Sequence, residues 1–272
     1  SLGHQWQLGG RKTLTVLNAV FNKSQYFDGR AADLKDQVVR SVMAFPAAML
    51  KTRGGPTIFD PAQMNLTKRR AVEQLKGIPG YRQAFEKAFP GESDPIAYDN
   101  VGRAIAVFEA TLTTPGAPFD LWLEGDDSAL SDAQKRGLSL FVEKGCGGCH
   151  NGVNIGGGMY ARFGVVKEPA PDILPSEDLG RYAVTRNLAD KYAFKVQSLR
   201  NVELNPPYFH SGRVWDLGQA VAIMGEAQLG VKLTEAETRD IVAFLCSLTG
   251  RQPEVVLPIL PPSVATTPRP QP

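Results

Sequence analysis

The chain has 272 residues, of which 43% are hydrophobic and 21% are charged, and its formal net charge is +2. These values are typical of a globular protein of one or two domains. The small net charge argues against nucleic acid as a partner, and no apolar run reaches the roughly 20 residues that a membrane-spanning helix needs. Ser1–His4 show no signal peptide and no start Met, so we expect the chain to begin after processing or partway through a longer protein.

Helical periodicity dominates the first half of the chain. Tyr81, Phe85 and Phe89 recur at a spacing of four residues, which predicts a helix that ends at Pro90–Gly91. A second helix is predicted over residues 98–112, with Val101, Ile105, Phe108 and Leu112 on its apolar face. The breaker-rich stretch over residues 113–120 predicts a domain boundary.

Two helices with capping boxes frame the second half. Ser131 with Gln134 opens one helix, and Thr234 with Glu237 opens the other. Residues 241, 244, 245 and 248 form the apolar stripe of the second helix, which Gly250 ends, and Cys246 on its flank is predicted to be a free thiol. The glycine- and proline-containing stretch 152–230 is predicted to be a long functional loop that wraps a large cofactor.

The last part of the chain is rich in proline. Residues 252–272 contain seven prolines in 21 positions, which predicts an extended arm over residues 251–272. Strand signals are few, and the sequence shows no internal repeat. We therefore expect an all-α protein.

The chemistry is carried by one motif. Cys146, Cys149 and His150 form C-x-x-C-H, the attachment sequence of c-type haem. The two thiols add to the haem vinyl groups, and the adjacent histidine then reaches the iron. A structural zinc site would need four ligands, and a thioredoxin-like motif would need a βαβ context that the sequence lacks.

A capped helix on each side of this motif is the arrangement of a cytochrome c domain. The second axial ligand of such a haem is usually Met or His. Met224 lies just before the last helix, whereas Met159 is close to His150 for a loop that must pass round the haem. We favour Met224 as the ligand over the alternative that it is an ordinary core methionine.

Three segments then resemble the bacterial dihaem cytochrome c peroxidases, and the resemblance covers nearly the whole chain. They are "TVLNAVFNKSQYFDGRAADLKDQ", "GCGGCHNGVNIGGGMYARFGVV" and "FKVQSLRNVELNPPYFHSGRVWDLGQAVAIMGEAQLG". The resemblance implies two cytochrome c-like haem domains in the periplasm, here residues 1–120 as the incomplete N-terminal peroxidatic domain and residues 121–250 as the electron-transfer domain. It also implies reduction of hydrogen peroxide with electrons from a small cytochrome c or copper protein, and it allows a homodimer.

Individual residues carry over from this family. Cys146, Cys149, His150 and Met224 match the electron-transfer haem site, which is the one haem c attached to this chain. The second C-x-x-C-H is expected upstream of Ser1, and His4 matches the histidine that ligates that second haem in the resting enzyme. Gln37 matches a distal-pocket glutamine, and Arg200 is expected either to pair with a haem propionate or to be a surface arginine. His210 matches the family without an assigned role, so we expect a satisfied structural histidine.

Several positions depart from the family pattern. Ala48 stands where the family has a distal glutamate, which would help to move protons, so we expect weak peroxidase activity. Phe27 stands where the family has a tryptophan between the haems, so the electron path is expected to differ. Lys12 replaces the asparagine of a calcium site whose carbonyl ligands match Asn205 and Pro207, so calcium is left open.

Three functions follow from these features. The first is a dihaem peroxidase, of which residues 1–120 form the rest of the peroxidatic domain. The second is a monohaem electron carrier, for which those 120 residues would have no purpose. The third is a dihaem enzyme that uses peroxide to oxidise residues of a partner protein, and the departures from the family pattern point partly toward it.

Overall fold

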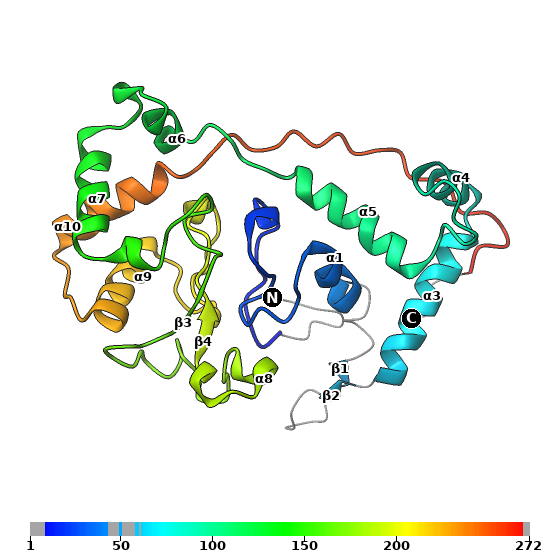
Figure 1. The fold of residues 1–272 in the computed structure, drawn as a ribbon, viewed down its shortest axis with the longest axis horizontal. Coiled ribbons are helices and arrows are strands. Elements are labelled where there is room, and N and C mark those ends of the chain that lie inside the picture. The colour runs from blue at the N-terminus through cyan, green and yellow to red at the C-terminus, as the bar shows by residue number, and fades with distance from the viewer. Residues whose placement is uncertain (1–8, 43–48, 51–57, 60, 269–272) are drawn as a thin grey trace. The chain divides into compact units, whose positions relative to one another are not determined.

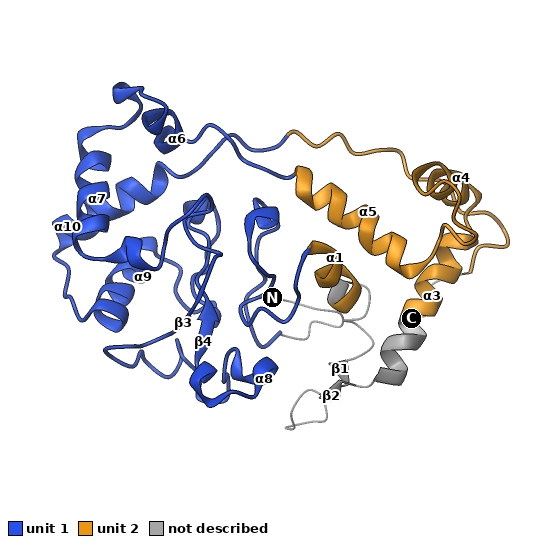
Figure 2. Cartoon of the chain, in the orientation of Figure 1, with its two compact units in different colours: residues 1–33, 112–253 blue, residues 34–111, 254–272 orange. Residues whose placement is uncertain are grey.

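The computed structural model describes residues 9–42, 49–50, 58–59 and 61–268 of the chain. By its contacts the chain separates into two compact units (Figure 2): unit 1 comprises Ser1–Asp33 and Leu112–Pro253, and unit 2 comprises Leu34–Thr111 and Glu254–Pro272. The expected domain boundary at residues 120/121 stays a prediction. None of the helices in the described ranges is both long and apolar enough to span a membrane.

Helices form most of the regular structure (Figure 1), which confirms the all-α prediction. Unit 2 contains α1 (Leu34–Gln37), α3 (Pro61–Lys76), α4 (Pro79–Ala88) and α5 (Tyr98–Thr111), and a π-helical turn, η3, over Val38–Val42. Its two-residue strands β1 (Met49–Leu50) and β2 (Ile58–Phe59) pair antiparallel. Unit 1 contains α6 (Pro118–Leu123), α7 (Asp132–Glu143), α8 (Tyr182–Thr185), α9 (Leu217–Met224) and α10 (Glu235–Cys246), with strands β3 (Tyr160–Arg162) and β4 (Ala193–Lys195).

Short helical turns connect these elements. Five are 3₁₀ turns: Ala19–Phe21 (η2), Asp127–Ala129 (η4), Cys146–Gly148 (η5), Leu188–Asp190 (η6) and Val202–Leu204 (η7). A π-helical turn over Gly225–Leu229 (η8) follows α9 directly. The stretch 152–230, expected to be a loop, therefore contains β3, β4, α8 and α9, whose short lengths give little periodic signal in the sequence.

The caps of α7 and α10 explain where these two helices begin. Gln134 N donates to Ser131 Oγ while Ser131 N donates back to Gln134 Oε1. Thr234 and Glu237 repeat this reciprocal arrangement at the start of α10. Both predicted capping boxes are thus confirmed, and each satisfies two backbone groups that a helix end leaves without partners.

The helices α7 and α10 pack directly against each other. Gly137 is buried at the contact, and the ring centroids of Phe141 and Phe244 lie 5.2 Å apart. Arg136 on α7 forms a two-pronged ion pair with Asp240 on α10, at 2.8 and 3.0 Å. An apolar core and a charged rim therefore fix the crossing of these two helices.

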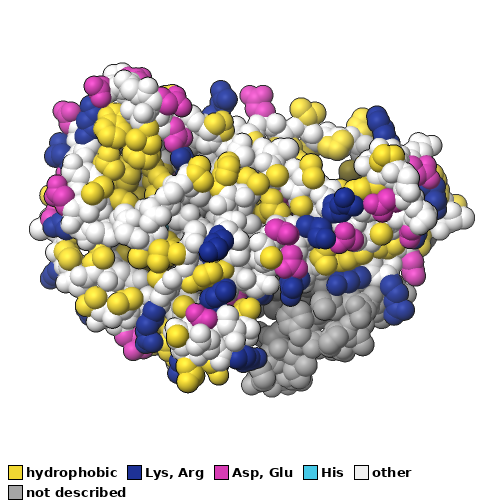
Figure 3. Space-filling view, in the orientation of Figure 1, with side chains coloured by type: hydrophobic (Ala, Val, Ile, Leu, Met, Phe, Trp, Pro, Cys, Tyr) yellow, Lys and Arg dark blue, Asp and Glu magenta, His cyan; other side chains and the backbone are white. Residues whose placement is uncertain are grey.

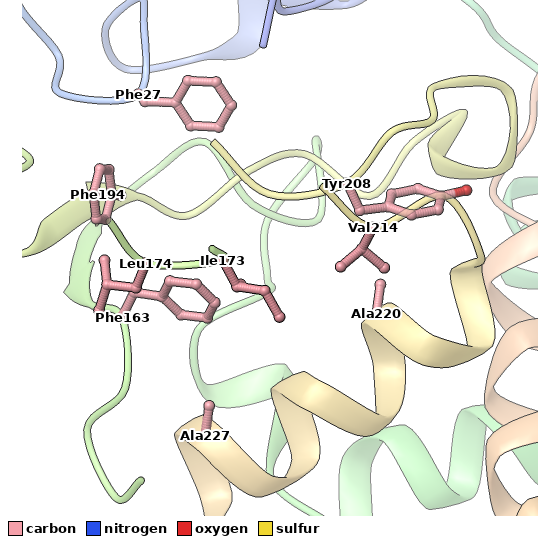
Figure 4. Packing of buried hydrophobic residues seen from close by; sticks show 9 residues of the cluster. All are labelled: Phe27, Phe163, Ile173, Leu174, Phe194, Tyr208, Val214, Ala220 and Ala227. Carbon is pink, nitrogen blue, oxygen red and sulfur yellow. The ribbon is translucent and has the colours of Figure 1, made fainter. Parts of the chain in front are cut away.

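Two apolar clusters form the core of unit 1. The first has nine buried members from the N-terminal segment, β4, α9 and the connecting loops (Figure 4): Phe27, Phe163, Ile173, Leu174, Phe194, Tyr208, Val214, Ala220 and Ala227. The second lies at the α7–α10 contact and contains Phe141, Ile155, Ile241, Phe244, Leu245 and Leu248. Val202 and Leu217 pack against both clusters, so apolar packing is continuous between them.

In unit 2 the packing of α5 differs from its sequence pattern. The predicted apolar face contained Phe108, but Phe108 is exposed, while Val101, Gly102 and Glu109 are buried. At Gly102 an added Cβ would meet Val39 at 2.7 Å, so α1 and the turn that follows it approach α5 closely at this glycine. Val101 of the predicted apolar face is therefore buried and Phe108 is not, while the missing side chain of Gly102 allows the close contact.

Candidate haem attachment site

The C-x-x-C-H motif forms one tight turn directly after α7. Gly145 adopts φ 94°, a left-handed conformation that ends the helix and is costly for other residues. His150 N and Cys149 N then both donate to Cys146 O, at 3.0 and 3.2 Å. The turn therefore brings Cys146, Cys149 and His150 together. Both cysteines are partly exposed free thiols, so they remain available for thioether bonds.

His150 has the properties of an axial ligand. Its Nδ1 atom is buried and has no hydrogen-bond partner among the described residues. Burial lowers the pKa of His150 to about 4, so the imidazole is neutral at neutral pH, which is the form that binds a metal ion.

Met224, the predicted second ligand, contacts the apolar core of unit 1. It is the last residue of α9, is partly buried and packs against the nine-residue cluster. Cys146 packs against the second cluster, which adjoins the first through Val202 and Leu217. Met159, the alternative ligand, is 40% exposed. Apolar packing therefore links the Cys146 turn to Met224 through the two clusters, and the ligand role of Met224 stays a prediction.

Arg200 is engaged with the protein itself. Its Nη1 and Nη2 atoms donate to the two carboxylate oxygens of Asp120 at 2.9 and 2.7 Å, and Nε donates to Val153 O at 2.7 Å. The Arg200 side chain is 13% exposed, so it is not a free surface arginine. Pairing with a haem propionate stays a prediction, and the ion pair with Asp120 was not visible in the sequence.

The residues expected around the second haem are only partly described. Gln37 is the half-buried last residue of α1 in unit 2. His4 and Ala48 lie outside the described residues. Their roles at the peroxide site therefore stay predictions.

The residues expected to hold calcium are described, and one of them carries a positive charge. Lys12 Nζ donates a hydrogen bond to Asn205 O, the carbonyl that the resemblance assigns to the metal ion. Pro207 follows two residues later. The described residues contain no cluster of three or more Asp, Glu, His or Cys side chains that could hold a metal ion. These groups do not fit calcium, because an ammonium already binds one of the expected ligands.

Phe27 and His210 belong to the core of unit 1. The His210 ring stacks on Phe194 with centroids 4.1 Å apart and meets Phe27 edge-on at 6.2 Å. Burial lowers the pKa of His210 to about 4, although the nearby Asp178 carboxylate acts in the opposite direction. The packing agrees with a structural role. However, His210 Nε2 has no hydrogen-bond partner among the described residues, so the prediction that its hydrogen bonds are satisfied is wrong for this atom.

The burial of Lys195 was not predicted from the sequence. Lys195 on β4 is 3% exposed, and its Nζ donates to Ser24 O at 2.9 Å while its backbone N donates to Phe27 O. Desolvation lowers the pKa of Lys195 to about 8. Its apolar neighbours Phe194 and Val196 were the only available signal. Lys195 ties the loop that carries Phe27 to β4.

Comparison with known proteins agrees with this site. The sequence matches a family model described as di-haem cytochrome c peroxidase over residues 1–128, and a cytochrome c model over residues 134–249. A cytochrome c551 peroxidase of Pseudomonas aeruginosa is 50% identical over 270 residues, covering 99% of this chain and 73% of the relative. The cytochrome c551 peroxidase of Nitrosomonas europaea is 45% identical, covering 100% of this chain and 75% of the relative. The methylamine utilization protein MauG of Methylorubrum extorquens is 33% identical, covering 92% of this chain and 68% of the relative.

Solved structures show the same fold. A MauG-like protein associated with microbial copper homeostasis superposes with a TM-score of 0.72 at 21% identity, covering 92% of this chain and 78% of that chain. The diheme peroxidase BthA of Burkholderia thailandensis gives a TM-score of 0.65 at 20% identity, covering 91% of this chain and 74% of that chain. Together with the much higher identity to the cytochrome c551 peroxidases, these findings show that the chain belongs to the di-haem cytochrome c peroxidase family.

Proposed function

We propose that the protein reduces hydrogen peroxide to water in the bacterial periplasm, with electrons from a small cytochrome c or copper protein. The observation that carries this proposal is the C-x-x-C-H turn with its buried, neutral His150, in a chain 50% identical to a cytochrome c551 peroxidase. The match of residues 1–128 to the peroxidase model argues against a monohaem carrier.

The haem c on this chain would serve as the electron relay. Cys146 and Cys149 would hold it through thioether bonds, and His150 and Met224 would bind its iron from opposite faces. When bound, the haem supplies a one-electron couple, and a thioether ligand raises its potential. With His150 and Met224 both holding the iron, this haem would pass electrons and would leave no position for peroxide. Arg200 would then orient the cofactor through a propionate or hold Asp120, with which it pairs here.

A second haem c, which the di-haem family implies, would be the site of peroxide chemistry. His4 would ligate it in the resting state, and Gln37 would position peroxide by hydrogen bonding. Ala48 cannot move protons, so this site would lack the carboxylate that assists cleavage of the O–O bond. We therefore expect slower turnover than with a glutamate at that position. A homodimer remains part of the proposal.

The alternative enzyme class is peroxide-driven oxidation of a partner protein. Ala48 and Phe27 favour it, because they replace the family's distal carboxylate and inter-haem tryptophan. The chain is also 33% identical to a methylamine utilization protein MauG.

One experiment separates these functions. The complete reading frame would be expressed with haem-maturation machinery, and haem per chain and peroxide turnover with a reduced cytochrome would be measured. Two haems with turnover support the peroxidase, two haems with negligible turnover support the protein-oxidising enzyme, and one haem refutes both.

A matched pair of variants tests the axial ligand. Met224→Ala should lower the reduction potential of the high-potential haem sharply, because it removes the thioether. Met159→Ala is the control and should leave the potential unchanged, since Met159 is partly exposed outside the core. A lower potential in Met159→Ala and an unchanged potential in Met224→Ala would identify Met159 as the ligand.

A further inference from the structure

The loop that follows η7 is held by one side chain from the N-terminal segment. Asn205 closes this turn, with its N–H donating to Val202 O at 3.1 Å. Its carbonyl oxygen accepts a hydrogen bond from Lys12 Nζ. The backbone of Lys12 also donates to His210 O at 2.8 Å, and Gly212 lies against the Lys12 side chain. Lys12 therefore binds both ends of the 205–212 loop.

The charge of Lys12 is balanced by carbonyl dipoles rather than by a carboxylate. None of the ion pairs among the described residues includes Lys12. The neighbouring Arg11 takes up the nearby acids, since it pairs with Asp28 at 2.8 Å and binds Asp178 through two nitrogens. A partly buried ammonium that binds a backbone carbonyl oxygen uses the kind of ligand that a hard metal ion would take.

We propose that the Lys12 ammonium is a built-in cation that takes the place of a divalent metal ion at the 205–212 loop. It supplies the positive charge that the Asn205 carbonyl and its neighbours would otherwise draw from solution. The protein therefore needs no calcium to hold this loop. Removing the ammonium uncovers a weak site for calcium. The site is weak because neutral carbonyl oxygens attract a hard cation less strongly than charged carboxylates do.

The test measures thermal unfolding and calcium binding, with no haem or peroxide readout, so its failure is distinct from failure of the proposed function. Wild type, Lys12→Asn, Lys12→Met and the control Lys23→Asn would be melted in calcium, in magnesium and in chelator. Lys23 is an exposed lysine of the same N-terminal segment. Isothermal titration with calcium accompanies the melts.

The melting temperatures of wild type and Lys23→Asn should be the same in calcium and in chelator. Lys12→Asn should melt several degrees lower in chelator and recover part of that loss in millimolar calcium, because its amide oxygen adds a ligand. Lys12→Met, which adds no oxygen, should recover less. Calcium binding by wild type overturns the proposal, even if the variants fail to fold. A folded Lys12→Asn protein that is indifferent to calcium overturns it as well.

Discussion

Replacing Gly137 by alanine tests whether the α7–α10 crossing holds unit 1 together. A Cβ atom at this position would lie 1.9 Å from Asp240 O and 2.9 Å from the Cβ of Phe244. The first of these neighbours is backbone inside α10, so it cannot swing aside as a flexible side chain would. The two helices would have to separate locally by about 1.5 Å to restore ordinary contact.

The size of the effect follows from two opposing terms. Forcing a methyl group into a packed contact costs roughly 1–3 kcal/mol, and a backbone obstacle places this site near the upper end. Alanine regains about 1 kcal/mol over glycine through its helix propensity. The net loss should therefore be about 2 kcal/mol, which corresponds to a melting temperature roughly 4–8 °C lower for a unit of this size.

Urea unfolding followed by far-UV circular dichroism would measure this loss. Ser139→Ala is the control, because Ser139 is exposed on the same helix and alanine there should change the unfolding free energy by no more than about 0.5 kcal/mol. If Gly137→Ala were as stable as wild type, the two helices would not touch at Gly137. The direct packing of α7 against α10 would then be refuted.

Three further changes test other contacts by urea unfolding. Asp120→Asn should cost about 2 kcal/mol by weakening the charged pair with Arg200, and a loss no larger than that of an exposed control would refute this contact. Burial raises the pKa of Glu109, so the unfolding free energy of the wild type should fall as pH rises through 4.5, the ordinary pKa of glutamate. Glu109→Gln should remove that fall. Identical pH profiles for the variant and the wild type would contradict this role of Glu109. Thr234→Ala should cost about 1 kcal/mol as a lost cap. The Lys144 and Thr234 hydrogen bonds lower the pKa of Glu237 to about 2, so its contribution is present above pH 4.5 and lost as pH falls toward 2, and Thr234→Ala should weaken that acid loss.

Local signals in the sequence predicted α7 and α10 well. Ser131 and Thr234 mark the helix starts because capping depends only on residues three positions apart. Ile241, Phe244, Leu245 and Leu248 are all buried, as the apolar stripe predicted. The haem motif was equally visible, since its three reactive residues lie within one turn.

Contacts between residues far apart along the chain could not be predicted from the sequence. Arg200 and Asp120 are 80 positions apart, and nothing local distinguishes either from an exposed charged residue. Within the breaker-rich stretch 113–120, Pro118 is the first residue of α6, where its missing N–H costs nothing. On α5 the close contact at Gly102 and the exposure of Phe108 could not be read from the apolar pattern, which did predict the burial of Val101.

The interspersed surface charge agrees with the small net charge of the sequence. On the visible face of the molecule, basic and acidic side chains lie among apolar ones rather than in a block of one sign (Figure 3). A face of this kind gives no broad positive field of the sort that draws nucleic acid to a protein.

The order of segments along the chain constrains how the molecule is made. The polypeptide passes between the two units three times, after Asp33, Thr111 and Pro253. The final segment returns to unit 2, where Pro261 lies against Gly80 and Thr267 Oγ1 donates to Gly77 O at 2.8 Å. On the ribosome, the helices of unit 2 would emerge early but wait for their last segment until all of unit 1 had been synthesised. Neither unit can be obtained as one uninterrupted piece by a single cut, so a genetic dissection would have to use circular permutation or internal linkers.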